Sequence, residues 1–465
     1  MKKVLAIVLT AIVAVAAVAQ EVPKKKKKMN LDEAESLFEY TKQVISSNAS
    51  FRFAIVANPE INANDTADCP FKQAMKELQF RTDIAFIIVL GNITADGSTA
   101  SLEMAKEMLK KTEKQYYVVP GIKDIALENA GGTAFKRVFG NDCFRANVNG
   151  IFFLGLNTAI LCNTEKGHIL PQKGKWFKNQ LKNAGKKIPV YIFTTNSLNG
   201  TGIDNWYDLT DIARHYNVQM FIDNQNGSFN KGITDGIPMY GIESLPESYT
   251  ICRVDSTTMI FDRKLLKSKS TPVDTTVIEA KMYLEPDPSL RPAEASMSDK
   301  KAWSFQAMTA VYTKVTASDK YCYFGDDQGA VYCLDLKKGK LKWKYNTMSR
   351  IIVKPVIVGN MVIVGSCDKN LYCLDATTGK FMWRVRTGLP VMKQPAIVDN
   401  RVYIEKNDSM LFNIELTTGE EFRPVRRETI QMPPVEKPEN GDTPLSGNEY
   451  VRSNIDGVIT KFVTK

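Results

Sequence analysis

The chain has 465 residues, of which 44% are apolar and 24% are charged, a composition typical of a soluble globular protein with roughly two to three domains. Its formal net charge is +10, but Lys2, Lys3 and the run Lys24–Lys28 supply seven of those charges and leave only +3 for the rest. A charge this small excludes a strongly basic nucleic-acid-binding domain, and we expect no nucleic-acid partner.

Residues 1–19 are predicted to be a secretory signal peptide. Lys2 and Lys3 precede an apolar run of about fifteen residues, and Ala17-Val18-Ala19 places small residues at a cleavage position. We therefore expect an exported protein, periplasmic or else extracellular, with no transmembrane segment after the signal is removed. A retained anchor is the alternative. Residues 20–30, which contain Lys24–Lys28, should form a solvated tether, although such a run can also lean on anionic lipid.

The eight cysteines include no CxxC pair, so the sequence does not support a zinc knuckle or a thioredoxin-like site. Export permits disulfides. In "YCYFGDDQGAVYC", a hairpin turning at Asp326–Gly329 would place Cys322 opposite Cys333. A disulfide there and a pair of buried thiols are both open at this point.

The first half of the chain, residues 31–265, alternates predicted strands and helices, which indicates a layered α/β domain. One of the strands, residues 84–92, is a continuous apolar run typical of a sheet covered on both faces. In such folds the sites lie in loops at the carboxyl ends of strands. The predicted strands are 51–60, 84–92, 116–121, 150–158, 189–196 and 217–226, and the predicted helices are 68–80, 101–112, 173–184 and 206–216.

The five strand ends "FAIVANPEI", "IIVLGNITADGS", "YYVVPGIKDI", "PVYIFTTNSL" and "NVQMFIDNQN" resemble, in order and spacing, those of the calcineurin-like metallophosphoesterases. The resemblance spans roughly 200 residues and implies that family's fold. The family carries Asp-x-His, Gly-Asp, Gly-Asn-His-Asp/Glu, a later His and Gly-His-x-His at these ends, and those residues bind two metal ions.

Carried over residue by residue, most of the family's ligands are replaced. The first Asp-x-His becomes Asn58-x-Glu60, and the bridging Asp becomes Asn92. The third strand keeps only Asp124 of its motif, and the last motif becomes residues 223–226. The resemblance therefore places the former metal and active-site positions at Asn58, Glu60, Asn92, Ile122, Lys123, Thr195, Asn196, Asn224 and Asn226.

A dinuclear phosphoesterase site needs several imidazoles, and this chain has only His168 and His215, neither of them at a predicted strand end. We expect both to be surface or packing residues. We therefore expect no catalytic residues, no metal and no enzymatic activity, that is, a pseudoenzyme. Asn at positions 58 and 92 keeps the shape of Asp without its charge.

Two other readings of the former metal cleft are open, beside an inert, solvated one. Glu60, Asp124 and Asp223 could form an oxygen-only Ca²⁺ site. Alternatively, Lys123 could help to bind a phosphate-bearing ligand without turning it over. The possible ligand cleft would then consist of Glu60, Lys123, Asp124 and Asp223.

Residues 266–301 are rich in Pro, Ser and charge and are predicted to be a linker. From residue 302 to 465 the sequence repeats with a period of 40 residues, which sets the spacing of Trp303, Trp343 and Trp383. Gly339, Gly379 and Gly419 repeat with the same period. Each copy is predicted to be strand, polar turn, strand, Gly-containing turn and strand, the pattern of a β-propeller blade.

The copy "LYCLDATTGKFMW" resembles the pyrroloquinoline-quinone (PQQ) type repeat, LxAxTGxxxW. Quinone-binding dehydrogenases of that family usually need a vicinal disulfide, and no adjacent Cys pair is present, so we expect no cofactor. Non-catalytic members of the BamB type use the repeat to bind proteins. The sequence holds about four repeats, which predicts a small closed ring, a partial propeller, or a homodimer that shares one ring.

Taken together, the sequence predicts α/β plus all-β architecture, with a metallophosphoesterase-like domain followed by a small or partial propeller. The predicted function is an exported, non-catalytic binding or scaffold protein of the bacterial envelope, with another envelope protein bound to the propeller. A phosphoesterase with an atypical site is the alternative, and a quinone-dependent oxidoreductase is a second one.

Overall fold

The computed structural model describes residues 50–64, 69–126, 132–161, 165–254, 258–277, 299–434 and 439–464. The predicted signal peptide, the predicted Lys-rich tether and Cys162 lie outside the described residues. None of the helices within those ranges is long and apolar enough to cross a membrane.

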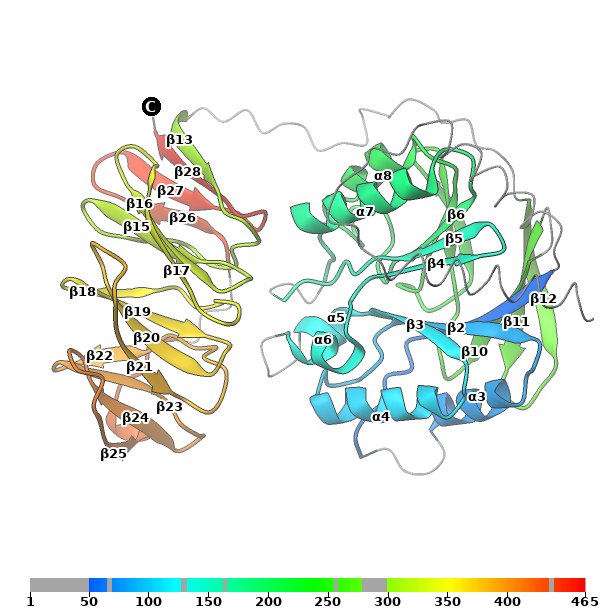
Figure 1. Cartoon of the computed structure of the whole chain (residues 1–465), viewed down its shortest axis with the longest axis horizontal. Coiled ribbons are helices and arrows are strands. Elements are labelled where there is room, and N and C mark those ends of the chain that lie inside the picture. Colours follow the sequence, from blue (N-terminus) through cyan, green and yellow to red (C-terminus); the bar gives the residue numbers. More distant parts are fainter. Residues whose placement is uncertain are drawn as a thin grey trace, which may run out of the picture. The chain divides into compact units, whose positions relative to one another are not determined.

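The first domain is built on two six-stranded sheets, coloured blue to green in Figure 1. The first sheet has the order β12-β11-β10-β1-β2-β3, in which β1, β2 and β3 are parallel neighbours. Its strands are β1 Phe51–Ala57, β2 Ile84–Gly91, β3 Gln115–Pro120, β10 Ser248–Val254, β11 Thr258–Leu265 and β12 Ser270–Val277.

The second sheet has the order β4-β5-β6-β7-β9-β8, with β5, β6, β7 and β9 parallel. Its strands are β4 Phe144–Val148, β5 Ile151–Gly155, β6 Val190–Phe193, β7 Val218–Asp223, β8 Asn230–Thr234 and β9 Ile237–Gly241. Since parallel strands end at the same edge, the loops after β5, β6 and β7 open on one side of the domain.

The two sheets face each other and helices cover their outer faces, which gives four layers. On β1, side chains alternate: Phe53 and Ile55 pack between the sheets, whereas Ala54 and Val56 pack under the helices. Figure 1 shows α3 and α4 on one side of the sheets and α7 and α8 on the other. The helices are α3 Pro70–Gln79, α4 Thr99–Lys110, α5 Ile122–Ala126, α6 Ala134–Phe139, α7 Pro171–Ala184 and α8 Tyr207–Ala213.

Each strand and helix predicted for this half is present, but the predicted end of the domain at residue 265 is too early. Strand β12, Ser270–Val277, lies inside the predicted linker and pairs antiparallel with β11. Its sequence, "STPVDTTV", is polar and contains Pro272. A proline is tolerated because β12 is an edge strand, where one ladder hydrogen bond can be lost.

The second domain consists of four antiparallel four-stranded sheets, the blades of a β-propeller. Three blades follow one another in the chain, and the fourth combines β13 with β26, β27 and β28. The first three are β14 Thr316–Ala317, β15 Tyr321–Gly325, β16 Ala330–Asp335 and β17 Leu341–Asn346; β18 Val356–Val358, β19 Met361–Ser366, β20 Asn370–Asp375 and β21 Phe381–Arg386; and β22 Ala396–Val398, β23 Arg401–Glu405, β24 Met410–Glu415 and β25 Glu421–Arg426. The fourth has β13 Lys300–Gln306, β26 Gly441–Pro444, β27 Glu449–Ser453 and β28 Val458–Val463. A 3₁₀ turn, η2 Arg427–Thr429, lies between β25 and β26.

The repeated tryptophans and glycines meet at the seams between blades. The ring of Trp343 lies where a side chain on Gly379 would stand, with Cδ2 only 2.5 Å from the position of that Cβ. Gly379 also has φ +71°, which L side chains rarely adopt. The indole Nε1 of Trp343 donates to the carbonyl of Ala376 at 2.9 Å. Trp303 and Trp383 repeat the contact on Gly339 and Gly419, so the period of 40 residues encodes one seam per repeat.

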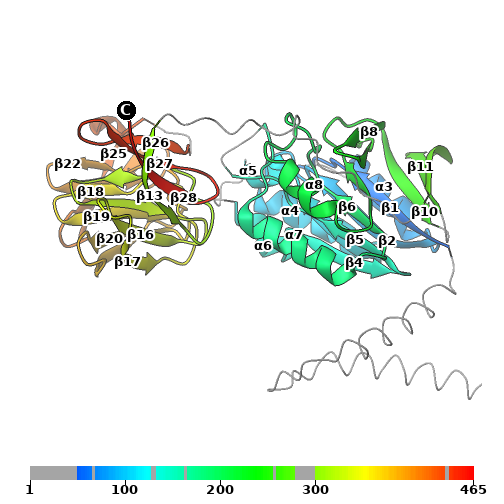
Figure 2. The same ribbon diagram turned by 90° about the horizontal axis from the view of Figure 1, so that it is seen from above.

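The four blades form a row in which neighbours share apolar cores. One core cluster joins the β13 blade to that of β14–β17, and two more join the following pairs. Among the described residues, no core cluster joins β22–β25 to β26–β28. Figure 1 shows these two blades at opposite ends of the row, and Figure 2 shows the same blades from above.

The predicted hairpin is present, but its register separates Cys322 from Cys333. Cys322 pairs with Leu334 and Tyr323 pairs with Cys333. Because neighbouring residues on a strand point to opposite faces, the two sulfurs lie in different cores. Both are free thiols, and burial raises the pKa of each to about 12. Of the two alternatives that the sequence left open, the structure therefore shows two buried thiols.

Candidate functional site

The carboxyl ends of β1 and β2 bring Asn58 and Asn92 together, as expected for neighbouring parallel strands. The backbone N–H of Asn92 donates to Oδ1 of Asn58 at 2.9 Å. Nδ2 of Asn58 donates to Oγ of Ser244 at 3.0 Å. Asn58 and Glu60 both adopt positive φ, +43° and +45°, so this loop is sharply turned. The side-chain amide of Asn58 thus bonds to its own neighbours.

Lys123 and Glu60 form an ion pair across this cleft. Nζ of Lys123 lies 2.8 Å from Oε1 of Glu60, and the backbone N–H of Lys123 donates to Oδ1 of Asn92 at 3.0 Å. Nδ2 of Asn92 also donates to Oε1 of Glu60, at 3.4 Å. The ammonium group of Lys123 therefore faces the carboxylate of Glu60. Ile122, the neighbouring residue, packs against the apolar core instead.

Asn224 directly follows β7 and is buried beside the end of β2. Its Nδ2 donates to the carbonyl of Leu90 at 3.2 Å, while its buried Oδ1 has no hydrogen-bond partner. Gly91 separates it from Asn58: a Cβ on Gly91 would lie 2.2 Å from Nδ2 of Asn224 and 2.4 Å from Oδ1 of Asn58. Only glycine fits there, with φ +89°.

Asp124, predicted as a cleft residue, is turned into the protein and fully buried. Its carboxylate accepts hydrogen bonds from the backbone N–H groups of Ile93, Thr94 and Gly121, each at 2.9 Å, and from Oγ1 of Thr94 at 2.8 Å. Burial raises the pKa of Asp124 to about 6, although the hydrogen bonds from these donors lower it. The prediction of a ligand role for Asp124 is therefore corrected: the carboxylate closes a loop.

Asp223 is likewise occupied by its own loop. Its Oδ1 accepts from Oγ of Ser197 at 2.8 Å and from the backbone N–H of Gln225 at 3.2 Å, and burial raises its pKa. Of the four residues of the possible ligand cleft, Lys123 and Glu60 bond to each other, whereas Asp223 bonds within its own loop. Asn226, the last predicted position, is exposed.

Thr195 and Asn196 form a separate group after β6. Oδ1 of Asn196 accepts from Oγ1 of Thr158 at 2.8 Å and from Oγ1 of Thr195 at 3.2 Å. A Cβ on Gly167 would lie 3.0 Å from that same oxygen, so the loop is closely packed. These residues bond to one another rather than to the Asn58–Asn92 pair.

Neither histidine lies at a strand end. His168 is buried, with Nδ1 at 2.7 Å from Oδ1 of Asp204, and His215 is exposed beyond α8. Within the ranges that the structure describes, no group of three or more His, Cys, Asp or Glu side chains is placed to share a metal ion. The groups around Asn58 are amides, a lysine and the Glu60 carboxylate that pairs with it, a set that does not fit a dinuclear cation site.

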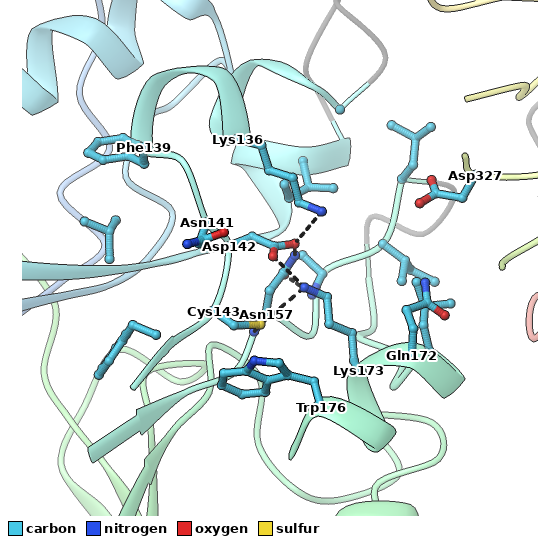
Figure 3. A pocket seen from close by; sticks show the side chains of 18 of the residues that line it. Lys136, Phe139, Asn141, Asp142, Cys143, Asn157, Gln172, Lys173, Trp176 and Asp327 are labelled. Carbon is cyan, nitrogen blue, oxygen red and sulfur yellow. Dashed lines mark hydrogen bonds and ion pairs between the residues drawn. The ribbon is translucent and has the colours of Figure 1, made fainter. Parts of the chain in front are cut away.

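A second polar group in the first domain carries no sequence motif. It lines the pocket of Figure 3, where Asp142 lies between two lysines. Nζ of Lys173, on α7, is 2.5 Å from Oδ1 of Asp142, and Nζ of Lys136, on α6, is 3.5 Å from Oδ2. Nδ2 of Asn157 donates to Oδ2 of Asp142 at 3.0 Å. Sequence analysis missed these residues because they come from four separate segments: α6, the loop before β4, the loop after β5, and α7.

Burial and charge act against each other in this group. Burial alone would raise the pKa of Asp142, but Lys173 and Lys136 outweigh it and hold that pKa at about 2. Burial also raises the pKa of the Cys143 thiol, whose Sγ lies 3.2 Å from Nζ of Lys173. A thiol with a raised pKa is a poor nucleophile, so this position of Cys143 does not favour a nucleophilic role. The distances instead indicate a buried ion pair that holds α6 and α7 together.

Comparison with known proteins identifies the class of the second domain. Residues 293–422 match the family profile described as "Outer membrane protein assembly factor BamB". Together with the four blades and the Trp–Gly seams, this match shows that these residues carry BamB-like PQQ repeats and confirms the predicted propeller. No curated protein sequence matches the chain.

Several solved structures are similar to parts of the chain. BamB from Moraxella catarrhalis is 14% identical, with 51% of this chain and 82% of that one covered and a TM-score of 0.23. GAP50, the anchor in the inner membrane complex of Plasmodium, is 13% identical, with 51% and 90% covered and a TM-score of 0.38. A europium-containing methanol dehydrogenase is 17% identical, with 29% of this chain but only 28% of that chain covered and a TM-score of 0.25. Values this low carry no argument about function.

Proposed function

We propose that the protein is an exported, non-catalytic scaffold of the bacterial envelope. In this proposal the first domain is a metallophosphoesterase-like domain without metals, and the second binds another envelope protein. The observation that supports it best is the ion pair between Lys123 and Glu60 at 2.8 Å, which sets a fixed cation among the former metal positions.

A second line of support is the bonding of the amides. Asn58 and Asn92 use their side-chain oxygens to accept backbone N–H groups at 2.9 and 3.0 Å. A divalent ion would have to displace these bonds, and the neutral amides would offset none of its charge. Among the described residues the site has no imidazole, and its carboxylate, Glu60, is paired with Lys123. This set differs from the imidazoles and carboxylates that a two-metal hydrolytic mechanism uses.

The test of inactivity is metal analysis of the purified chain after incubation with Mn²⁺ and Zn²⁺, together with hydrolysis of bis(p-nitrophenyl) phosphate. We expect bound metal far below one equivalent and no turnover above buffer. Metal near two equivalents with turnover would contradict the proposal. A variant with Asn58→Asp, Asn92→Asp and Lys123→His serves as the positive comparison, and we expect it to take up more metal than the parent.

The second half of the proposal assigns binding to the propeller, because BamB-like repeats form the blades and the matched family is described as an assembly factor. Two chains sharing one ring would be an alternative use of the uncovered ends of the row. Solution mass separates the two ideas: the mass of one chain supports a free binding surface, and twice that mass supports a shared ring.

A further inference from the structure

The seams of the propeller carry a row of basic side chains on the face that bears the Gly-containing turns. The first turn presents Lys337, Lys338 and Lys340, all exposed, and Lys342 follows on β17. At the second turn, Lys380 is exposed in the same way. The start of β13 adds two more exposed lysines, Lys300 and Lys301.

The seam contacts make these residues neighbours. Trp303 of β13 packs on Gly339 and donates its Nε1–H to the carbonyl of Leu336 at 3.0 Å, so β13 lies against the first turn. Trp343 of β17 packs on Gly379, so β17 lies against the second turn. The lysines of three blades therefore form one continuous basic row.

The carboxylates near these turns, Asp299, Asp319, Asp335 and Asp375, are fewer than the seven lysines. Asp335 accepts the backbone N–H groups of Lys337 and Lys338 at 3.0 and 2.9 Å, and Asp375 does the same for Thr377 and Thr378 in the second turn. Asp319 is exposed on the neighbouring turn. The third turn reverses the sign, since Glu420 and Glu421 stand there in place of lysines.

Large apolar side chains project among the lysines. Leu341, Phe381 and Met382 begin β17 and β21 and are between 41% and 52% exposed. Leu341 lies on β17, and Phe381 and Met382 lie on β21 of the next blade. Exposed apolar tips flanked by lysines are the combination that binds an interface where headgroups are anionic and acyl chains lie just beneath them.

We propose that this basic row docks on a bilayer surface that carries anionic phosphate headgroups. The lysines attract the headgroups, and Leu341, Phe381 and Met382 enter the boundary between headgroups and acyl chains. This inference goes beyond the scaffold function and does not depend on whether the first domain is inactive.

The test is co-sedimentation with vesicles of phosphatidylcholine alone and of phosphatidylcholine mixed with phosphatidylglycerol. The chain used begins at Gln20, directly after the predicted signal peptide. Its Lys24–Lys28 run is replaced by serines to remove a competing basic segment. We expect binding to the mixed vesicles only, and weaker binding at high salt because the charges are exposed.

The decisive variant is Lys337→Glu/Lys338→Glu/Lys340→Glu, which we expect to weaken binding by about tenfold or more. Its matched control, Lys175→Glu/Lys178→Glu/Lys182→Glu on exposed positions of α7, changes net charge equally and should leave binding unchanged. Phe381→Ser/Met382→Ser should weaken binding several-fold at constant charge. Circular dichroism melts establish that each variant is folded.

Three results would overturn the proposal. Equal loss in both triple variants would mean that net charge alone matters. Equal binding to pure phosphatidylcholine would exclude recognition of anionic headgroups. Binding to poly-glutamate without binding to mixed vesicles would assign the row to an acidic protein partner.

Discussion

Two lysine–carboxylate pairs of the first domain have similar geometry and different surroundings. Lys123 and Glu60 lie 2.8 Å apart, with side chains 37% and 40% exposed. Lys173 and Asp142 lie 2.5 Å apart, with side chains only 16% and 11% exposed. Sequence motifs point to the first pair, whereas the second has no motif.

The difference shows that a residue's place in a motif and its contribution to stability are separate properties. An exposed pair is screened by water and contributes little. A buried pair leaves a desolvated charge behind when one partner is removed, which is strongly destabilising. The surroundings of the Lys123–Glu60 pair should therefore tolerate substitution far better than the pocket of Figure 3.

Lys173→Met gives the largest expected effect, because it leaves Asp142 buried with only the more distant Lys136. We expect the free energy of unfolding to fall by about 3 to 5 kcal/mol, measured by urea denaturation at pH 7. Lys136→Met is the matched control: its side chain is about half exposed and 3.5 Å from Asp142, so we expect a loss below about 1 kcal/mol. Equal losses of unfolding free energy in Lys173→Met and Lys136→Met would contradict the expected difference between a buried and an exposed ion pair.

Lowering the pH gives the next largest expected effect, through the protonation of Asp142. The folded pKa of Asp142, about 2, lies below its ordinary value of 3.8, so the ionised carboxylate stabilises the fold above that ordinary value. This contribution is lost as pH falls through about 2. The difference in unfolding free energy between the parent and Asp142→Asn should therefore shrink by about 2 kcal/mol between pH 5 and pH 2. A difference that stays constant over this range would contradict the assignment.

Lys123→Met should give the smallest effect. Its ion pair is exposed, so we expect the unfolding free energy to change by less than about 1 kcal/mol in urea denaturation. Glu60→Gln should behave alike, and the double variant should cost no more than the sum of the two. A loss as large as that of Lys173→Met would show that the cleft contributes to folding as much as the pocket does.

The sequence predicted the features that follow from strand order and periodicity. Asn58 and Asn92 meet because apolar runs located two parallel strands whose ends must coincide. The period of 40 residues likewise predicted the blades, since each repeat carries its own seam.

Features that depend on register or on distant pairings escaped prediction. Cys322 and Cys333 do not lie opposite each other because the strand pairing is shifted by one residue from the expected one. Such a shift turns a side chain to the other face of the sheet. Asp124 turned inward because three loop N–H groups needed an acceptor. Asp142 and Lys173 come from segments whose proximity only the packing of α7 beside the sheet decides.

The contact between each tryptophan and the glycine of the following blade also constrains how this chain could have changed in length. A residue inserted between Trp343 and Gly379 in a strand would shift the indole away from the glycine that leaves room for it. Small insertions should therefore survive only at turns remote from the seams. Otherwise, evolution would have to add or delete whole blades, so homologues should differ in steps of one complete unit.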